Sequence, residues 1–296
     1  MTKDLVSVII PVYKNIHFLK DSLSSVINQT YSNIEIIVVD DGSNASQQIL
    51  KICNKFKKKI KIITIKRNKG VSTCLNKAIK ISKGKYINWL SHDDLFCPTK
   101  IDEQVKSLKG SPDTISVTNF IIWDYEKNIS KISKQQQKDF INFKQKILIK
   151  DIYNFCTFLI PKKLFNNNFF CEKLRYVQDY DMILKLSKKA RFTFLNKNLF
   201  ISRKHSQQGS VDNYNEWLRE KNKFYISNIS FYTQLLKNKK SVVDIFYTLF
   251  FIHSKKLEDF NLTLESKINK INNQKIICIN KTVKIFFKIL YVFRIK

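Results

Sequence analysis

The sequence predicts an α/β protein in which helices flank a mostly parallel, Rossmann-like sheet and a helical extension follows. Four strand-and-helix repeats succeed one another in the first hundred residues, an order typical of a parallel sheet with right-handed crossovers. The strands are β-branched runs of the kind that is buried on both faces of a sheet. With 296 residues, 44% of them hydrophobic, the chain can bury a large core.

The elements follow from the hydrophobic pattern, taken in chain order. We expect buried strands at residues 6–10, 34–39, 60–65 and 85–90, the first of them ended by Pro11. Helices are expected where apolar side chains recur every three or four residues, at 19–27, 49–56, 71–78 and 98–108. A further strand at 155–160, a turn or short helix at 161–165, a helix near Asp179 and a strand at 192–201 complete a domain over residues 1–214.

Residues 215–296 differ in character and predict a basic helical extension. Lys281, Lys284 and Lys288 recur at helical spacing among large apolar residues, which predicts a basic amphipathic helix. Such a helix can lie on an anionic membrane surface or dock onto the domain at residues 1–214, and the sequence leaves both open. No apolar run approaches the ~20 residues that span a bilayer. We therefore expect a cytoplasmic protein, at most peripheral on the inner face of the cell membrane.

Lys and Arg outnumber Asp and Glu by 53 to 24, a formal charge of +29. Residues 1–100, 101–214 and 215–296 carry +10, +9 and +10, so the charge is spread along the chain. Nucleic-acid binders concentrate positive charge on one face or arm, and we therefore expect no nucleic-acid partner. A compositional bias or an anionic partner, either a membrane surface or a phosphorylated substrate, can account for the excess. The six cysteines lack the spacing of zinc or redox motifs.

Polar clusters follow each of the first four strands, and the carboxyl ends of parallel strands are where ligands bind in such sheets. The clusters lie at 11–13, 40–43, 67–70 and 91–94. The chain has five glycines and no glycine-rich phosphate loop, so a cradle of backbone amides is not expected. Carboxylates that bind Mn²⁺ or Mg²⁺ can hold a diphosphate instead. Asp93 and Asp94 are candidates for that role, and a cap on the following helix is the alternative for each.

Read in order, the segments Val6–Tyr13, Val38–Ser43, Asn68–Gly70 and Ser91–Asp94 resemble the inverting family 2 glycosyltransferases, which have a GT-A fold. The resemblance covers roughly residues 4–210. It implies a nucleotide-sugar donor, usually a UDP-sugar, a divalent metal, and displacement with inversion at the anomeric carbon. The expected acceptor is a hydroxyl of a cell-surface glycan or lipid-linked precursor, such as a lipopolysaccharide or capsule intermediate.

The resemblance also implies roles for individual residues. Pro11, Tyr13 and Asp41 match positions that contact the base and ribose, and Asp93 matches the metal-binding end of the DXD motif. The nucleotide-sugar site is therefore expected to comprise Pro11, Tyr13, Asp40, Asp41, Arg67 and His92. The expected metal ligands are Asp93, Asp94 and His205. His205 follows the strand at 192–201, where related enzymes often place a histidine that completes the metal site or contacts the diphosphate.

Asp179 is the expected general base, because it matches the Asp of the Glu-Asp pair that carries this role in the family. Spacing alone favours the alternative, in which Asp179 caps the helix that follows and Asp181 complements the helix dipole. The chain departs from the family at Ser91, Leu75 and Gln178, where members usually have Asp, Arg and Glu. These departures motivate an alternative, a catalytically degenerate protein that binds a sugar nucleotide.

Overall fold

The computed structural model describes residues 3–56, 60–108, 111–133, 154–166, 168–208, 213–230, 258–270 and 274–292. The described residues fall into two compact units, which divide between residues 208 and 213. The first unit holds the sheet and the helices packed on it, and the second is helical.

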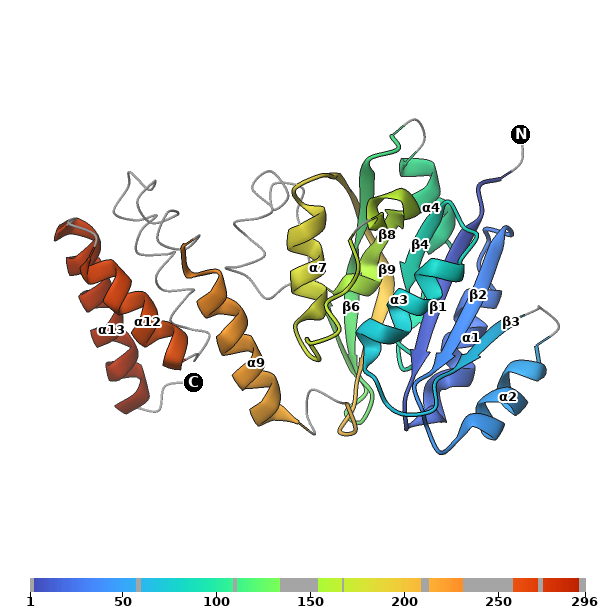
Figure 1. Cartoon of the computed structure of the whole chain (residues 1–296), viewed down its shortest axis with the longest axis horizontal. Coiled ribbons are helices and arrows are strands. Elements are labelled where there is room, and N and C mark those ends of the chain that lie inside the picture. Colours follow the sequence, from blue (N-terminus) through green and yellow to red (C-terminus); the bar gives the residue numbers. More distant parts are fainter. Residues whose placement is uncertain are drawn as a thin grey trace. The chain divides into compact units, whose positions relative to one another are not determined.

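The first half of the sheet confirms the four predicted parallel strands (Figure 1). They are β1 (Val6–Val12), β2 (Ile34–Asp40), β3 (Ile60–Thr64) and β4 (Tyr86–Trp89), arranged in the order β3-β2-β1-β4. Every residue of β1 is buried, as expected of a central strand that is covered on both faces. This order brings the carboxyl ends of β1, β2 and β4 to one edge, where three of the polar clusters begin.

The prediction that Pro11 ends the first strand is wrong, because β1 continues to Val12. Pro11 pairs with Val39 in the register of β1 and β2, whereas the pairing with β4 stops at Ile9 and Trp89. The amide of Asp41 donates to the Val12 carbonyl, so the backbone of Val12 faces β2 and the nitrogen of Pro11 faces the other way. The Leu90 amide donates to the Ile9 carbonyl, so the next bond of this ladder would start from the nitrogen of residue 11. Proline lacks that hydrogen, and the pairing of β1 with β4 ends there.

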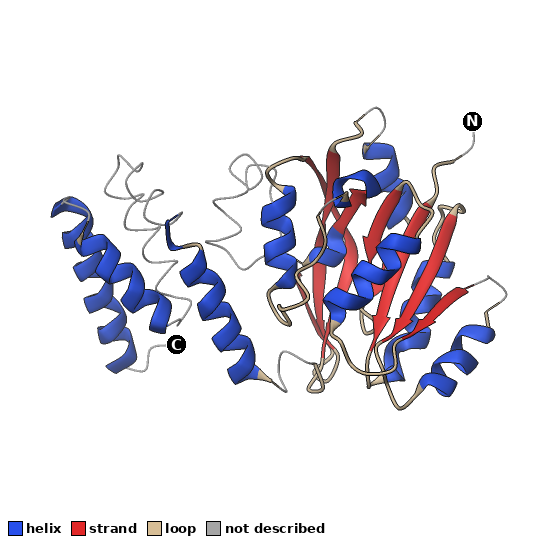
Figure 2. Ribbon diagram, in the orientation of Figure 1, coloured by secondary structure: helices blue, strands red, loops and turns tan. Residues whose placement is uncertain are grey.

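Helices cover both faces of this half-sheet (Figure 2). In Figure 1, α3 lies in front of the strands and α1 behind them. A 3₁₀ turn, η1 (Ile16–Phe18), leads into α1. The helices are α1 (Leu19–Ile27), α2 (Ser46–Asn54), α3 (Val71–Ile81) and α4 (Lys100–Ser107). Each matches a predicted helical segment and buries the apolar face that predicted it, such as Leu19, Leu23 and Val26 of α1.

The second half of the sheet is mixed, in the order β4-β8-β6-β9-β5 with β7 on the free side of β6. Its strands are β5 (Leu95–Phe96), β6 (Thr114–Asp124), β7 (Ile129–Ser133), β8 (Phe158–Pro161) and β9 (Arg191–Lys204). Its helical elements are η2 (Phe155–Thr157), η3 (Lys162–Phe165) and α7 (Gln178–Leu186). The strand predicted at 155–160 thus begins as a 3₁₀ turn, in which the Asn154 side chain accepts the Cys156 amide.

The second unit contains α9 (Tyr214–Ser227), α12 (Glu258–Asn269) and α13 (Gln274–Val292). Leu264 and Ile268 of α12 are fully buried, as is Val283 of α13. An ion pair of 2.5 Å joins Lys284 to Glu265 of α12. The predicted basic helix is therefore present as α13, although the side chains beyond Lys284 lie outside the described residues. Among the described helices, none combines the length and the apolar character that crossing a membrane requires.

Candidate functional site

The adjacent carboxylates at the end of β2, Asp40 and Asp41, accept hydrogen bonds from different segments. Asp40 is buried, and its Oδ1 accepts the Ser43 amide at 2.9 Å while its Oδ2 accepts the Ser46 hydroxyl. Asp40 therefore shapes the turn into α2, although the sequence placed it in the nucleotide-sugar site. Asp41 reaches the loop after β3, where its Oδ1 accepts the Lys69 amide at 2.8 Å and its Oδ2 the Gly70 amide at 2.7 Å.

Gly42 lets the two loops approach closely. It has φ +71°, and a Cβ there would lie 2.6–2.7 Å from backbone atoms of Arg67 and Asn68. Any side chain at this position would have to displace backbone. Gly42 and Asp41 together hold the loop that leads into α3, which explains why a glycine follows the acidic pair.

A cavity of about 200 Å³ opens where β1, β2 and β4 end. Five of the predicted site residues line it: Pro11, Tyr13, Asp41, His92 and Asp93. Sequence reasoning missed Trp89, the last residue of β4, and Cys74 of α3, which also line the cavity. Burial raises the pKa of the Cys74 thiol, so this sulfur remains a neutral, apolar wall. The lining joins apolar and aromatic surface to a few carboxylates, the composition of a small-molecule site.

Asp93 and His205 meet at this cavity although 112 positions separate them in the chain. Asp93 Oδ2 lies 3.2 Å from His205 Nε2, and both side chains are mostly buried. Burial pushes the pKa of Asp93 up, but the hydrogen bond to His205 and the charges of His92 and His205 outweigh it and lower the pKa below its usual value. Asp93 is consequently an ionised carboxylate, a ligand type that suits Mn²⁺, and it lies beside an imidazole, a common metal ligand in proteins.

Asp94 points away from this pair, although the sequence placed it among the metal ligands. Its Oδ1 accepts the Arg203 amide of β9 at 2.8 Å, and the residue is buried. Burial, together with the charge of Asp93, raises the pKa of Asp94 well above its usual range. The alternative prediction, that these carboxylates cap the next helix, is wrong because Thr99 is the N-cap of α4. Among the described residues, no three His, Cys, Asp or Glu side chains form a metal-binding cluster.

Asp179 lies in the first turn of α7, one residue after the helix begins. The prediction that it is the N-cap is wrong, since Val177 holds that position, and Asp179 Oδ1 accepts the Tyr180 amide at 2.9 Å. Asp179 is not one of the residues that line the 200 Å³ cavity. Asp181 forms an i,i+4 ion pair of 2.6 Å with Lys185, in keeping with its predicted role on the helix.

The segment that leads to Asp179 is tied to α3. Glu172 accepts hydrogen bonds of 3.0 Å from both Asn76 and Thr73. The bond from Asn76 is the main cause that lowers the pKa of Glu172, and burial opposes it. Arg175 donates to the Asn68 side chain at 2.7 Å. The loop that Asp41 holds and the approach to α7 therefore share contacts. No sequence pattern had singled out Glu172 or Asn76 for this role.

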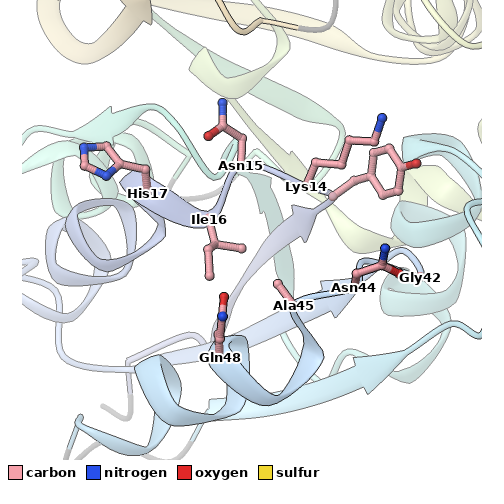
Figure 3. Close-up of a pocket in the computed structure, with 9 residues that line it drawn as sticks. Lys14, Asn15, Ile16, His17, Gly42, Asn44, Ala45 and Gln48 are labelled. Carbon is pink, nitrogen blue, oxygen red and sulfur yellow. The ribbon is translucent and has the colours of Figure 1, made fainter.

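A second cavity, of about 550 Å³, lies between the loop after β1 and the start of α2 (Figure 3). Ile16 and Gln48 point toward one another across it in Figure 3. Of the predicted site residues, Tyr13 alone lines it, and Tyr13 also lines the smaller cavity. Asn15 on its rim donates to Gln207 at 2.5 Å, two residues beyond His205. Asp41, His92 and Asp93 line the smaller cavity, whereas His17 lines the larger one. The smaller cavity is therefore the candidate site despite its size.

Solved structures share this architecture. S. aureus TarS 1–349 in complex with UDP-GlcNAc superposes with a TM-score of 0.65 at 15% identity, covering 96% of this chain and 91% of that one. Mannosyltransferase PcManGT from Pyrobaculum calidifontis, in complex with GDP-Man and Mn²⁺, gives a TM-score of 0.55 at 14% identity, covering 95% and 74%. The fold is that of the GT-A glycosyltransferases, as the sequence predicted.

Sequence comparison identifies the family. The profile of glycosyl transferase family 2 matches residues 7–169, more than half of the chain. The protein therefore belongs to glycosyl transferase family 2, which confirms the resemblance carried by its strand-end motifs.

An uncharacterized glycosyltransferase of Rickettsia conorii is 36% identical over 220 residues, which are 72% of this chain and 36% of that protein. Glycosyltransferase GlyG of Streptococcus pneumoniae is 25% identical over 228 residues, 70% and 73% of the two chains. The chain spans about a third to two thirds of the length of the Rickettsia relatives that it matches.

Proposed function

We propose that the chain transfers one sugar from a nucleotide-sugar, a UDP-sugar by preference, to a hydroxyl of a cell-surface glycan or lipid-linked precursor. The observation that carries this proposal is the meeting of Asp93 and His205 beside the cavity at the ends of β1, β2 and β4. Two proteins of similar fold add support, since structures exist of TarS in complex with UDP-GlcNAc and of PcManGT in complex with GDP-Man and Mn²⁺.

The donor occupies the cavity that Tyr13, Asp41 and Asp93 line. The cavity is smaller than the ~300–1,000 Å³ of typical ligand sites, so the donor extends beyond it over the exposed ring of Tyr13. An aromatic ring at that place offers a stacking surface to a base. Asp41 keeps two backbone bonds and still has lone pairs to accept a further donor from the nucleoside.

Asp93 and His205 are the residues that would hold Mn²⁺ or Mg²⁺. Their donor atoms suit such an ion, and Mg²⁺ in particular commonly takes one or two carboxylates plus substrate phosphates and water, so two protein ligands suffice. When bound, the cation neutralises charge that develops on the leaving diphosphate. Asp94 contributes indirectly in this proposal, because its bond to the Arg203 amide fixes the loop that carries Asp93.

Asp179 acts as general base, and its place in the first turn of α7 favours the ionised form. The acceptor oxygen attacks the anomeric carbon while its proton passes to Asp179. The bond between that carbon and the diphosphate oxygen breaks, and its electron pair leaves with the nucleoside diphosphate. Direct displacement in one step inverts the anomeric configuration. Gln178 and Ser91 replace acidic family residues but leave Asp179 and Asp93 in place.

The experiment is a donor panel. The purified chain is incubated with UDP- and GDP-sugars, each with and without Mn²⁺, and release of the nucleoside diphosphate is measured. Release from at least one donor, stimulated by Mn²⁺, supports the proposal. Binding of a donor without any release, including in the presence of candidate acceptors, favours the alternative of a degenerate sugar-nucleotide-binding protein.

The helical extension at residues 215–296 is proposed to place the chain on an anionic membrane surface at the cytoplasmic face.

A further inference from the structure

Arg203 is a buried cation close to the Asp93–His205 pair. Its side chain is 2% exposed and packs against three aromatic rings from two segments of the chain. The guanidinium carbon lies 4.1, 5.4 and 5.6 Å from the ring centroids of Phe18, Trp123 and Tyr125. At these distances a guanidinium is attracted to the electron-rich ring faces.

The charge of Arg203 is incompletely compensated. Its Nη2 lies 3.4 Å from Asp21, a side chain that is 59% exposed, and its buried Nε and Nη1 have no hydrogen-bond partner. Burying a cation in this way is costly, and an apolar side chain of similar volume is often as stabilising or more so. The stability of the fold alone therefore does not account for an arginine at this position.

The contacts of Arg203 lead to the site. Its backbone amide holds Asp94, the neighbour of Asp93. Its guanidinium and the imidazole of His205 both contact Phe18, whose ring centroid lies 5.0 Å from that of His205. The two residues are two positions apart at the end of an extended strand, which places their side chains on the same side. Phe18 is thus held by Arg203 and itself packs against His205.

We propose that Arg203, acting through Phe18, is a positioning residue that keeps the His205 imidazole in place beside Asp93 for binding of the divalent cation. This role rests on the proposed function, because it presupposes that Asp93 and His205 hold a metal with the donor. Residues that orient metal ligands typically contribute about 10–100-fold to metal affinity. Arg203 has an effect of this kind without touching donor or acceptor.

The test measures Mn²⁺-dependent binding of UDP by titration calorimetry, together with thermal stability. In Arg203→Met, which replaces the cation by a long apolar side chain, the half-saturating Mn²⁺ concentration should rise about 10–100-fold while the melting temperature stays equal or increases. Arg203→Lys keeps the charge but loses the planar stacking surface. Its Mn²⁺ requirement should lie between that of the parent chain and that of Arg203→Met. A purely structural role would lower stability without changing the Mn²⁺ requirement.

Lys100→Met is the matched control. Lys100 is also a buried cation over a ring, with its Nζ 4.2 Å from the centroid of Phe96, and it bonds to Gln104. Its removal should leave the Mn²⁺ requirement unchanged. Phe18→Leu is a second variant that should raise the requirement even where Arg203→Met does not fold.

Two results would overturn the positioning role. One is an unchanged Mn²⁺ requirement in the folded variants of Arg203 and Phe18, and the other is an equal rise in Lys100→Met. Absence of Mn²⁺-dependent UDP binding by the unmodified chain would contradict the proposed metal site itself. The two failures are therefore distinguishable.

Discussion

The imidazole of His205 lies 3.2 Å from the carboxylate of Asp93, and this contact joins the end of β9 to the loop after β4. The two strands are not neighbours in the sheet, since β8 and β6 lie between them. The contact depends instead on β5, which follows this loop directly and pairs antiparallel with β9, with Leu95 opposite Ile201. Its consequences for binding, catalysis and stability can be tested separately.

Asp179→Asn tests the general base. The amide cannot accept the proton of the acceptor, so kcat should fall by about 10²–10⁴-fold. Donor affinity should stay nearly constant, because the base acts on the acceptor and mainly in the transition state. Stability should change little, since the Asn side-chain oxygen can still accept the Tyr180 amide. Turnover, UDP affinity and melting temperature are measured on one preparation, and retained turnover would remove Asp179 from the mechanism.

Asp41→Asn tests the clamp between the loops after β2 and β3. One of the two bonds to Lys69 and Gly70 is replaced by a repulsive contact between two N–H groups, and a charged hydrogen bond contributes roughly 1.5–3 kcal/mol. We expect a loss of about that size in the free energy of unfolding, measured in urea. Asp181→Asn, which breaks a helix-surface ion pair, should cost only about 0.3–0.5 kcal/mol. Equal losses in both would show that the clamp contributes little.

Lys100→Met tests how a buried cation affects stability against pH. Burial lowers the pKa of Lys100 to about 7, below the ordinary value of 10.5. Between these two values the unfolded chain binds more protons than the folded one. The contribution of Lys100 to the free energy of unfolding therefore becomes more favourable as the pH rises from 7 toward 10.5. The stability of Lys100→Met should therefore exceed that of the parent by most near pH 6.5, and this difference in stability should shrink toward pH 9.5. Thermal melts across this range decide it, and a constant difference would be inconsistent with a titrating lysine.

Charge reversal on α13 tests the membrane surface. Lys281 is exposed, and Lys288 lies seven positions, or two helical turns, further along α13. The double variant Lys281→Glu, Lys288→Glu should bind anionic vesicles more weakly, by about 1 kcal/mol for each positive charge lost and more for the reversal. Transfer to a short soluble acceptor should be unaffected. Unchanged binding in vesicle sedimentation would favour docking of the helix on protein.

The first half of the fold could be predicted because its strands are uninterrupted β-branched runs and its helices carry regular apolar stripes. Strand β6 was missed, because Ser116, Thr118 and Asn119 interrupt its pattern although all three are buried. Their burial depends on pairing with β8 and β9, which follow much later in the chain. Local pattern carries no information about such partners.

The candidate site could be predicted only in part, because local pattern again carries no information about partners far along the chain. The strand-end rule and the family motifs grouped four acidic residues, of which Asp41 and Asp93 line the cavity. Asp40 is the last residue of β2, so its side chain points away from that of Asp41 and bonds to the turn into α2. Asp94 accepts the Arg203 amide instead. The role of Arg203 depends on the rings of Phe18 and of the segment 123–125, which are far apart in sequence, and residue spacing cannot reveal such contacts.

The central claim is that Asp93, with His205, binds the diphosphate of a donor through a divalent cation. The most direct measurement is calorimetric titration of UDP into the chain and into Asp93→Ala, with and without Mn²⁺, alongside Asp102→Ala as a carboxylate control on α4. The account predicts that Mn²⁺ tightens UDP binding in the parent and in Asp102→Ala, and that Asp93→Ala loses this Mn²⁺-dependent part and all donor turnover. Mn²⁺-dependent UDP binding that survives intact in Asp93→Ala would contradict it.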